Sequence, residues 1–301
     1  MKKIFRSRLN FFALLMIALM VIVVGCGTAA TTPAPAPQTV ETPKPARPDL
    51  ILATTTSTQD SGLLNVLLPI FEKKTGYKVK TIAVGTGAAL DMGEKGDADV
   101  LLVHAFSAEK KLVDDKTALN YQLVMHNDFI IVGPASDPAK AKETKTAVDA
   151  LKAIYASPAL FVSRGDKSGT DIMEKALWKK ADLTPSGSKY LQSGQGMGAT
   201  LTMASDKEAY TLTDRATYLS MKKNLKLDIL VQGEASLLNI YHVMQVNPEK
   251  WPKVNADGAK AFVEFMINPD TQKTIGSYGT DKYGQALFFP DAGKKMEDVG
   301  K

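Results

Sequence analysis

The chain has 301 residues, with 37 basic and 32 acidic side chains and one cysteine. A single cysteine excludes a disulfide framework and a cluster of thiolate metal ligands. Four of the basic residues precede residue 25, which leaves 33 against 32 in the rest of the chain, and no basic stripe with interleaved aromatic residues is present, so we expect no nucleic acid as a partner.

Residues 1–25 have the order of charged and apolar residues that is typical of a secretory signal peptide. Four basic residues precede the apolar run 11–24, which is shorter than the ~20 residues that a membrane-spanning helix needs. Cys26 follows in the segment VVGC, which resembles the bacterial lipobox. We expect residues 1–25 to be removed and Cys26 to be lipidated, which would anchor the exported protein to the cell membrane. The alternative is an incidental cysteine beside another cleavage point.

Residues 26–48 are rich in Pro, Ala and Thr and have almost nothing to bury. Such a composition predicts a tether in an extended, polyproline-like conformation. About 250 residues follow, which is enough for one large domain or two of ordinary size.

The segment 49–76 contains an apolar strand, a hydroxyl-rich turn and an amphipathic helix. Residues 50–52 predict a buried strand, and five hydroxyl residues follow closely: Thr54, Thr55, Thr56, Ser57 and Thr58. Apolar residues then recur with helical spacing until the lysines and glycine at 73–76. The start of a helix has backbone N–H groups without partners and suits an anion. One hydroxyl would be enough to cap the helix, so five in a row favour a binding role, with capping alone as the alternative.

The pattern then alternates between strands and helices. We expect strands at 79–84, 100–104, 129–133 and 159–162, and helices at 88–95, 146–155, 171–180 and 199–205. This alternation predicts an α/β fold with a largely parallel sheet, in which ligands bind at the strand ends.

A second hydroxyl-rich turn, residues 163–170, follows the strand at 159–162 and adds an arginine. The planar fork of donors on Arg164 matches tetrahedral oxyanions, and Ser168, Gly169 and Thr170 would offer hydroxyls and a close backbone approach at a helix start. The alternative is a surface salt bridge from Arg164 to Asp166 or Asp171.

Other candidate sites are weaker. The three histidines lack metal-ligand spacing, Asp97 and Asp99 suit a polar turn better than acid/base catalysis, and the glycine-rich segment 193–200 is not a P-loop. For residues 208–215 a structural turn and a wall of the cleft are equally favoured. An exported ester hydrolase with Ser57 or Ser168 as nucleophile is the competing hypothesis, but no base can be assigned.

The segments ATTTSTQDSGLL (53–64), GDADVLLVHA (96–105), SRGDKSGT (163–170) and SGQGMGATL (193–201) resemble the tungstate-binding proteins of bacterial ABC importers, the TupA family. The resemblance covers essentially all of 49–295. It implies a type II periplasmic-binding-protein fold, with two α/β lobes, a ligand cleft between them and two hinge crossings near 129–132 and 236–239. The lobes would be 49–129 with 239–295, and 130–238.

The resemblance also implies a binding protein and not an enzyme, a monomer that delivers tungstate, and also molybdate, to a permease and its ATPase. Related phosphate receptors use an arginine and a Ser-Gly-Thr turn, but also need a carboxylate, and the strand at 100–105 ends without one. A phosphate or sulfate receptor is therefore second, and we expect no metal or other cofactor. The expected oxyanion ligands are Thr55, Thr56, Ser57, Thr86, Arg164, Ser168, Gly169 and Thr170.

Overall fold

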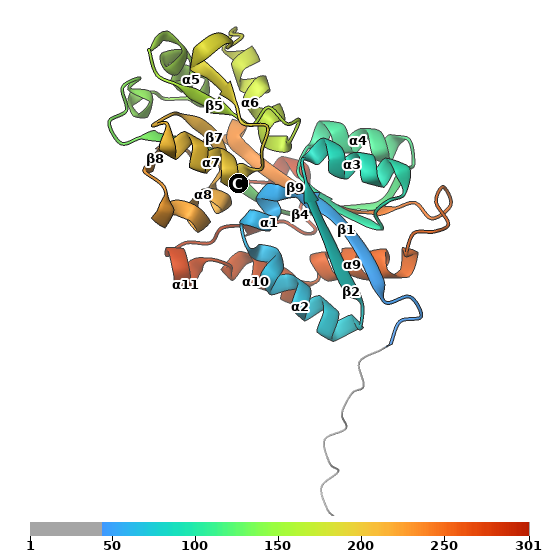
Figure 1. Ribbon diagram of the computed structural model, residues 1–301. Helices are drawn as coiled ribbons and strands as arrows, with labels where there is room; N and C mark the ends of the chain where they lie inside the picture. Colours follow the sequence, from blue (N-terminus) through green and yellow to red (C-terminus); the bar gives the residue numbers. More distant parts are fainter. Residues whose placement is uncertain (1–43, 301) are drawn as a thin grey trace, which may run out of the picture. The chain divides into compact units, whose positions relative to one another are not determined.

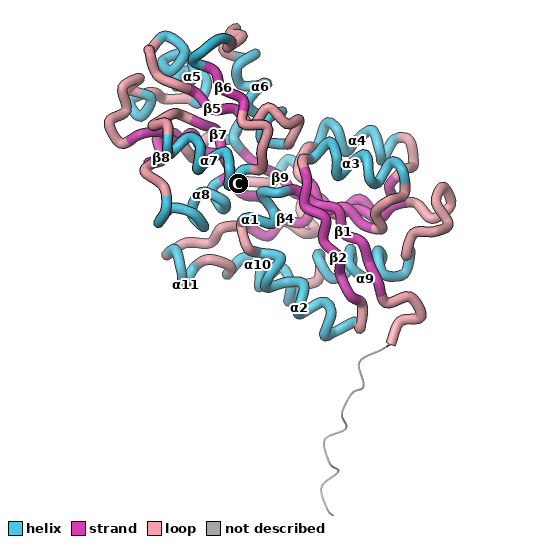
Figure 2. The backbone as a smooth tube through the Cα atoms, in the orientation of Figure 1, coloured by secondary structure: helices cyan, strands magenta, loops and turns pink. Residues whose placement is uncertain are grey.

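A computed structural model describes residues 44–300 of the chain. The predicted signal peptide, Cys26 and most of the tether lie outside the described residues. The described part has the expected α/β fold with two lobes (Figures 1 and 2). None of its helices is long and apolar enough to cross a membrane.

The first lobe is built on the parallel strands β1 (Asp49–Thr55), β2 (Lys78–Val84) and β3 (Val100–Val103). Alternate residues of a strand point to opposite faces, and here they enter different cores. Leu50 and Leu52 pack with α2 (Leu63–Thr75) and α9 (Ala256–Ile267), whereas Ala53 packs with α3 (Thr86–Lys95) and α4 (Phe106–Asp114). The helices therefore cover both faces of the sheet, as Figure 1 shows.

Two long strands, β4 (Ala118–Pro134) and β9 (Leu238–Val246), connect the lobes. β4 pairs with β9 as far as Asp128, and from Phe129 it pairs with β7 (Thr211–Asp214). The expected strand at 129–133 is therefore only the end of a longer one. The predicted lobe boundaries stay a prediction.

The expectation of a largely parallel sheet is wrong. β9 pairs antiparallel with both β3 and β4, and β4 pairs antiparallel with β7, β8 (Leu227–Val231) and β10 (Phe289–Pro290). The reason is that the chain passes between the lobes twice, once in each direction, and the two crossing strands lie side by side. Parallel pairing is kept by β1, β2 and β3 and by β5 (Phe161–Ser163) with β6 (Tyr190–Gln192).

The second lobe packs helices on both faces of the end of β4. Phe129 and Ile131 pack with α5 (Ala147–Ala156) and α6 (Gly169–Lys180), and Ile130 and Val132 pack with α7 (Met197–Asp206) and α8 (Arg215–Met221). The remaining helices are α10 (Pro269–Ser277), α11 (Thr280–Tyr283) and the short 3-10 turns Ala141–Glu143, Gly187–Lys189, Lys222–Asn224, Ala235–Leu237 and Met296–Asp298.

The helix expected after the first hydroxyl-rich turn is two helices. α1 (Thr56–Asp60) ends at Asp60 with Ser61 as its C-cap, and α2 begins after Gly62, whose φ of 81° lies in the left-handed region. The Tyr278 hydroxyl donates to the Ser61 carbonyl at 2.9 Å, and a Cβ on Gly62 would lie 2.7 Å from that hydroxyl oxygen. The break between α1 and α2 thus coincides with a contact from Tyr278, more than 200 residues away in the chain, which the local sequence pattern does not show.

Candidate functional site

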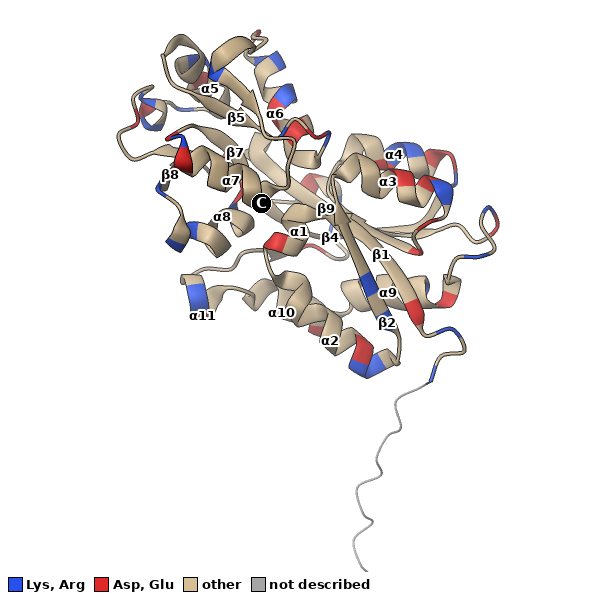
Figure 3. Cartoon of the chain, in the orientation of Figure 1, with Lys and Arg blue, Asp and Glu red and all other residues tan. Residues whose placement is uncertain are grey.

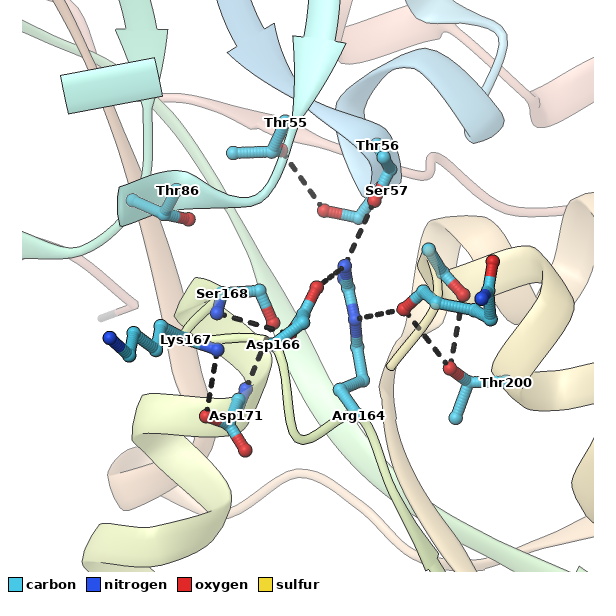
Figure 4. Close-up of polar contacts among 12 residues, drawn as sticks. Thr55, Thr56, Ser57, Thr86, Arg164, Asp166, Lys167, Ser168, Asp171 and Thr200 are labelled. Carbon is cyan, nitrogen blue, oxygen red and sulfur yellow. Dashed lines mark hydrogen bonds and ion pairs between the residues drawn. The ribbon is translucent and has the colours of Figure 1, made fainter. Parts of the chain in front are cut away.

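The predicted site residues lie at the starts of three helices and at the ends of two strands. Thr55 ends β1, Thr56 and Ser57 begin α1, and Thr86 begins α3. Arg164 follows β5, Ser168 is the N-cap of α6, and Gly169 and Thr170 are its first residues. Figure 4 shows the Thr56 side chain and Asp166 at the end of the Arg164 guanidinium, with Ser168 beside Asp166 and with Thr55 and Thr86 farther from Arg164.

Direct hydrogen bonds join the two lobes here. Arg164 Nη2 donates to the Thr56 hydroxyl at 3.1 Å, and the Gly169 N–H donates to the Thr86 hydroxyl at 2.8 Å. The structure therefore brings together the two hydroxyl-rich turns that lie more than a hundred residues apart in the sequence.

Arg164 is buried, with 1% of its surface exposed. Its Nε donates to the Gln195 carbonyl at 3.2 Å, and its Nη2 lies 2.5 Å from Asp166 Oδ2. Among the described residues none accepts a hydrogen bond from Nη1. The salt bridge to Asp166 that the sequence left open is thus present, but it is buried, and it leaves one edge of the guanidinium without a protein acceptor.

The other candidate partner of Arg164, Asp171, has a different role. Its carboxylate accepts from the Gly165 and Lys167 N–H groups and pairs with Lys175 Nζ at 2.7 Å. These bonds hold the turn 163–170 in shape. Asp171 is therefore a structural residue of the turn.

Several hydroxyls near Arg164 retain a proton to donate. Within the described residues, the Thr56, Thr86 and Ser168 hydroxyls appear only as acceptors, from Arg164 Nη2, Gly169 N and Asp171 N. The buried Thr170 hydroxyl has no partner there. Each hydroxyl carries one proton, so Thr56, Thr86, Ser168 and Thr170 supply four hydroxyl donors in addition to Nη1 of Arg164.

Thr55 and Ser57 are engaged differently, by a residue that the sequence analysis did not assign to the site. His104, directly after β3, is 6% exposed, and its Nε2 lies 2.9 Å from the Thr55 hydroxyl and 3.2 Å from the Ser57 hydroxyl. Burial lowers the pKa of His104 to about 4, with the Asn239 hydrogen bond opposing and the Arg164 charge adding to this effect. The ring is therefore neutral at physiological pH. The sequence signal that could have identified His104 is its position as a polar residue directly after a buried apolar strand.

The glycine-rich segment 193–200 forms a wall beside Arg164. The Gln195 carbonyl accepts from Arg164 Nε, and Ser193 and Thr200 bond to each other at 2.7 Å. A Cβ on Gly196 would lie 3.2 Å from Cβ of Thr56 in the other lobe. The glycine there allows the two lobes to approach closely.

Three carboxylates surround Arg164. Asp166 pairs with it directly. Burial raises the pKa of Asp214 to about 6 and also raises that of Asp60, whereas the Arg164 charge lowers both. Positive charge is therefore not in excess, and an anion bound here would depend on the hydrogen-bond donors aimed at it.

Among the described residues, no group of three or more His, Cys, Asp or Glu side chains could hold a metal ion. Asp99 instead accepts from the Ile51 and Asn255 N–H groups at 2.6 Å each. Asp97 pairs on the surface with Lys253 at 3.1 Å. Both carboxylates thus belong to the polar turn that enters β3.

Comparison with known proteins agrees with the fold. Residues 30–270 match the family described as PBP superfamily domain. The tungstate-binding protein TupA of Peptoclostridium acidaminophilum is 52% identical over 251 residues, which are 83% of this chain and 88% of the relative.

Two solved structures are also similar. The tungstate ABC transporter structure from Geobacter sulfurreducens has 52% identity and a TM-score of 0.71, over 76% of this chain and 98% of that chain. The tungstate-binding protein TupA from Desulfovibrio alaskensis G20 has 50% identity and a TM-score of 0.67, over 81% and 99%.

The chain therefore belongs to the PBP superfamily, as its two lobes and the polar site between them indicate. Within that superfamily it is a member of the family of the tungstate-binding proteins TupA. The family resemblance drawn from the sequence motifs is confirmed.

These relatives also decide against the hydrolase hypothesis. Ser57 does lie 3.2 Å from a histidine, but the Thr55 hydroxyl is nearer to the same nitrogen, and the other ring nitrogen faces the neutral amide of Asn239. Ser57 is also fully buried. The relatives are binding proteins of transporters, and the chain is a solute-binding protein and not an enzyme.

Proposed function

We propose that this chain is the extracytoplasmic, lipid-anchored receptor of an ABC importer and that it binds tungstate between its lobes. Molybdate, an oxyanion of the same shape and charge, is the second ligand. The bound anion is delivered to a membrane permease and its ATPase. The relatives described above support this proposal, since those at 50% identity or more bear the name of a tungstate-binding protein or a tungstate ABC transporter.

One observation carries the assignment to an oxyanion. Nη1 of Arg164 is buried and lacks an acceptor among the described residues, and so does the Thr170 hydroxyl, six residues further along the chain. A buried donor without an acceptor is costly, and a guanidinium is suited to a tetrahedral oxyanion. These donors of the second lobe, together with the Thr56 and Thr86 hydroxyls of the first, favour one anionic ligand between the lobes.

The charge of the ligand must be met locally. Without the first 25 residues the chain has 33 basic and 32 acidic residues, and Figure 3 shows both signs on the helices α4 and α6. Such a distribution provides little long-range attraction for a dianion. Arg164 and the hydroxyl donors around it are therefore the proposed binding groups.

In this proposal the ligand set is the one expected from the sequence. Arg164, Thr56, Thr86, Ser168 and Thr170 contribute side-chain donors, and Thr55, Ser57 and Gly169 contribute through the backbone or by positioning. The lobes that close on the anion are 49–129 with 239–295, and 130–238.

Phosphate or sulfate is the alternative ligand. A hydrogen phosphate needs an acceptor for its proton. The acceptors near β3 are already occupied: His104 Nε2 faces the Thr55 and Ser57 hydroxyls, and the two Asp166 oxygens accept from Arg164 and the Ser168 N–H. A fully ionised oxyanion has no proton to offer, so it fits this donor set better than hydrogen phosphate does.

Isothermal titration calorimetry of the purified chain with tungstate, molybdate, sulfate and phosphate tests the assignment. We expect tungstate and molybdate to bind and sulfate and phosphate to bind far more weakly. Sulfate or phosphate binding as tightly as tungstate would refute it.

The membrane anchor has its own test, because it rests on Cys26 and the apolar run before it. Metabolic labelling with a fatty acid should mark the wild type and not the Cys26→Ala variant. Equal labelling of both proteins would exclude Cys26 as the lipidated residue.

A further inference from the structure

His104 connects three parts of the molecule that meet at the site. Its Nε2 faces the Thr55 and Ser57 hydroxyls at 2.9 and 3.2 Å, and its Nδ1 lies 2.8 Å from Asn239 Oδ1 on β9. Its third neighbour is Gly169 of the opposite lobe, where an added Cβ would lie 2.8 Å from both Cε1 and Nδ1 of the ring.

The neighbours of Asn239 determine which ring nitrogen carries the proton. The Asn239 amide nitrogen donates to Asn127 Oδ1 at 2.8 Å and to the Tyr241 hydroxyl at 3.1 Å, so its oxygen is the atom that faces His104. A carbonyl oxygen only accepts, and Nδ1 must therefore be the protonated nitrogen. Nε2 is left as an acceptor.

An accepting Nε2 takes a hydroxyl proton from the first turn. Thr55 lies nearest to it, and the Thr58 and Ser57 hydroxyls lie 2.7 and 3.1 Å from the Thr55 oxygen. The Thr55 oxygen also accepts from the Thr58 N–H at 3.3 Å, so when Thr55 donates to the ring its oxygen has room for one more proton, from the Thr58 or the Ser57 hydroxyl. The Ser57 hydroxyl faces only this oxygen and Nε2. The Thr56 hydroxyl, which accepts from Arg164, is then the one in this turn that is directed at the anion.

We propose that His104 is the positioning residue of the site: its Nε2 holds the Thr55 and Ser57 hydroxyl protons away from the ligand, and its ring is the surface against which Gly169 closes. The role of Nε2 rests on the proposed function, since it states which hydroxyls of the first turn bind the oxyanion and which do not. Thr55 and Ser57 then act through the shape of the turn and their backbone N–H groups.

The proton on the ring can be measured without any ligand. The chain has three histidines, so ¹⁵N-histidine labelling gives few signals, and those absent from His104→Asn belong to His104. We expect the Nδ1–H tautomer for His104 in the wild type. A ring protonated on Nε2 would overturn the proposal, and this result does not depend on whether tungstate binds.

A pair of substitutions separates the two hydrogen bonds of the ring. The end of a glutamine side chain reaches the place of Nε2 and can accept there, whereas asparagine reaches only the place of Nδ1. We expect His104→Gln to keep tungstate affinity within about threefold of the wild type and His104→Asn to lose roughly tenfold or more. An equal loss in both variants, or a greater loss in His104→Gln, would refute the role of Nε2.

The closure surface is tested by a double-mutant cycle. Gly169→Ala should weaken tungstate binding by about tenfold or more in the wild type, but by less than about threefold in His104→Ala, which removes the ring that the new methyl meets. Gly87→Ala is the matched control, because its added Cβ would lie 3.7 Å from the Lys167 carbonyl oxygen of the opposite lobe, an ordinary contact. The same loss from Gly169→Ala in both backgrounds would exclude His104 as the closure surface.

If the wild type bound no tungstate, the proposed function would fail, but the tautomer would still decide the proton state of His104. If the wild type bound tungstate and the tautomer or the cycle gave the opposite result, only the role of His104 would fall.

Discussion

Replacing Arg164 with alanine tests the proposed site most directly. The guanidinium has five N–H donors. In the structure Nε donates to the Gln195 carbonyl, and Nη2 contacts the Thr56 hydroxyl and Asp166. The two N–H groups of Nη1 have no acceptor among the described residues, so these two are available to an oxyanion.

The expected loss follows from those two donors. A hydrogen bond to a charged partner contributes about 1.5–3 kcal/mol, so two of them give about 3–6 kcal/mol, or roughly a hundred- to ten-thousand-fold weaker tungstate binding. Arg164→Ala also leaves the Asp166 carboxylate without its cation, and this charge would repel a dianion. Arg164→Lys should recover only part of the loss, because a lysine lacks the planar fork.

Calorimetry with tungstate measures this effect, and circular dichroism shows whether each variant is folded. Lys222→Ala is the control, because Lys222 pairs with an aspartate of its own lobe, Asp228, outside the proposed site. It should leave the affinity unchanged. If folded Arg164→Ala binds tungstate like the wild type, or if Lys222→Ala loses as much affinity, Arg164 is only a structural residue.

Three further predictions concern the site, the fold and the response to pH. Thr56→Val should weaken tungstate binding by about tenfold, the effect of one lost bond to a charged ligand; a calorimetric affinity equal to that of the wild type would remove Thr56 from the ligand set. Gly96→Ala should lower the free energy of unfolding by about 1–3 kcal/mol more than the control Gly187→Ala. Both glycines have positive φ, but only at Gly96 would the new methyl meet another side chain, Trp251, at 2.3 Å. Equal urea midpoints for the two variants would contradict this. Between pH 6.5 and about 4, His104 binds a proton in the unfolded chain but stays neutral in the folded protein. As pH falls through this range, the free energy of unfolding should therefore fall by roughly 3 kcal/mol more in the wild type than in His104→Asn. Parallel pH profiles of the two proteins in urea unfolding would show that His104 titrates normally.

The parts of this protein that its sequence determined are those that depend on neighbouring residues. The alternation of apolar residues places β1, β2 and β3, and α3, α5, α6 and α7 lie within about two residues of their expected bounds. The hydroxyl-rich turns and Arg164 were found because strand, polar turn and helix follow each other directly in the chain. The family followed from the same short motifs.

The tertiary structure decided what depends on residues far apart in the chain. The antiparallel pairing of β4 with β9 joins segments more than a hundred residues apart, and strand periodicity contains no information on the partner or its direction. Likewise, the sequence offered two aspartates for Arg164, and only the folded turn selects Asp166. The local sequence marks His104 only as a polar residue at the end of a buried strand. Its role comes from Thr55, Asn239 and Gly169, which three different elements bring to its ring.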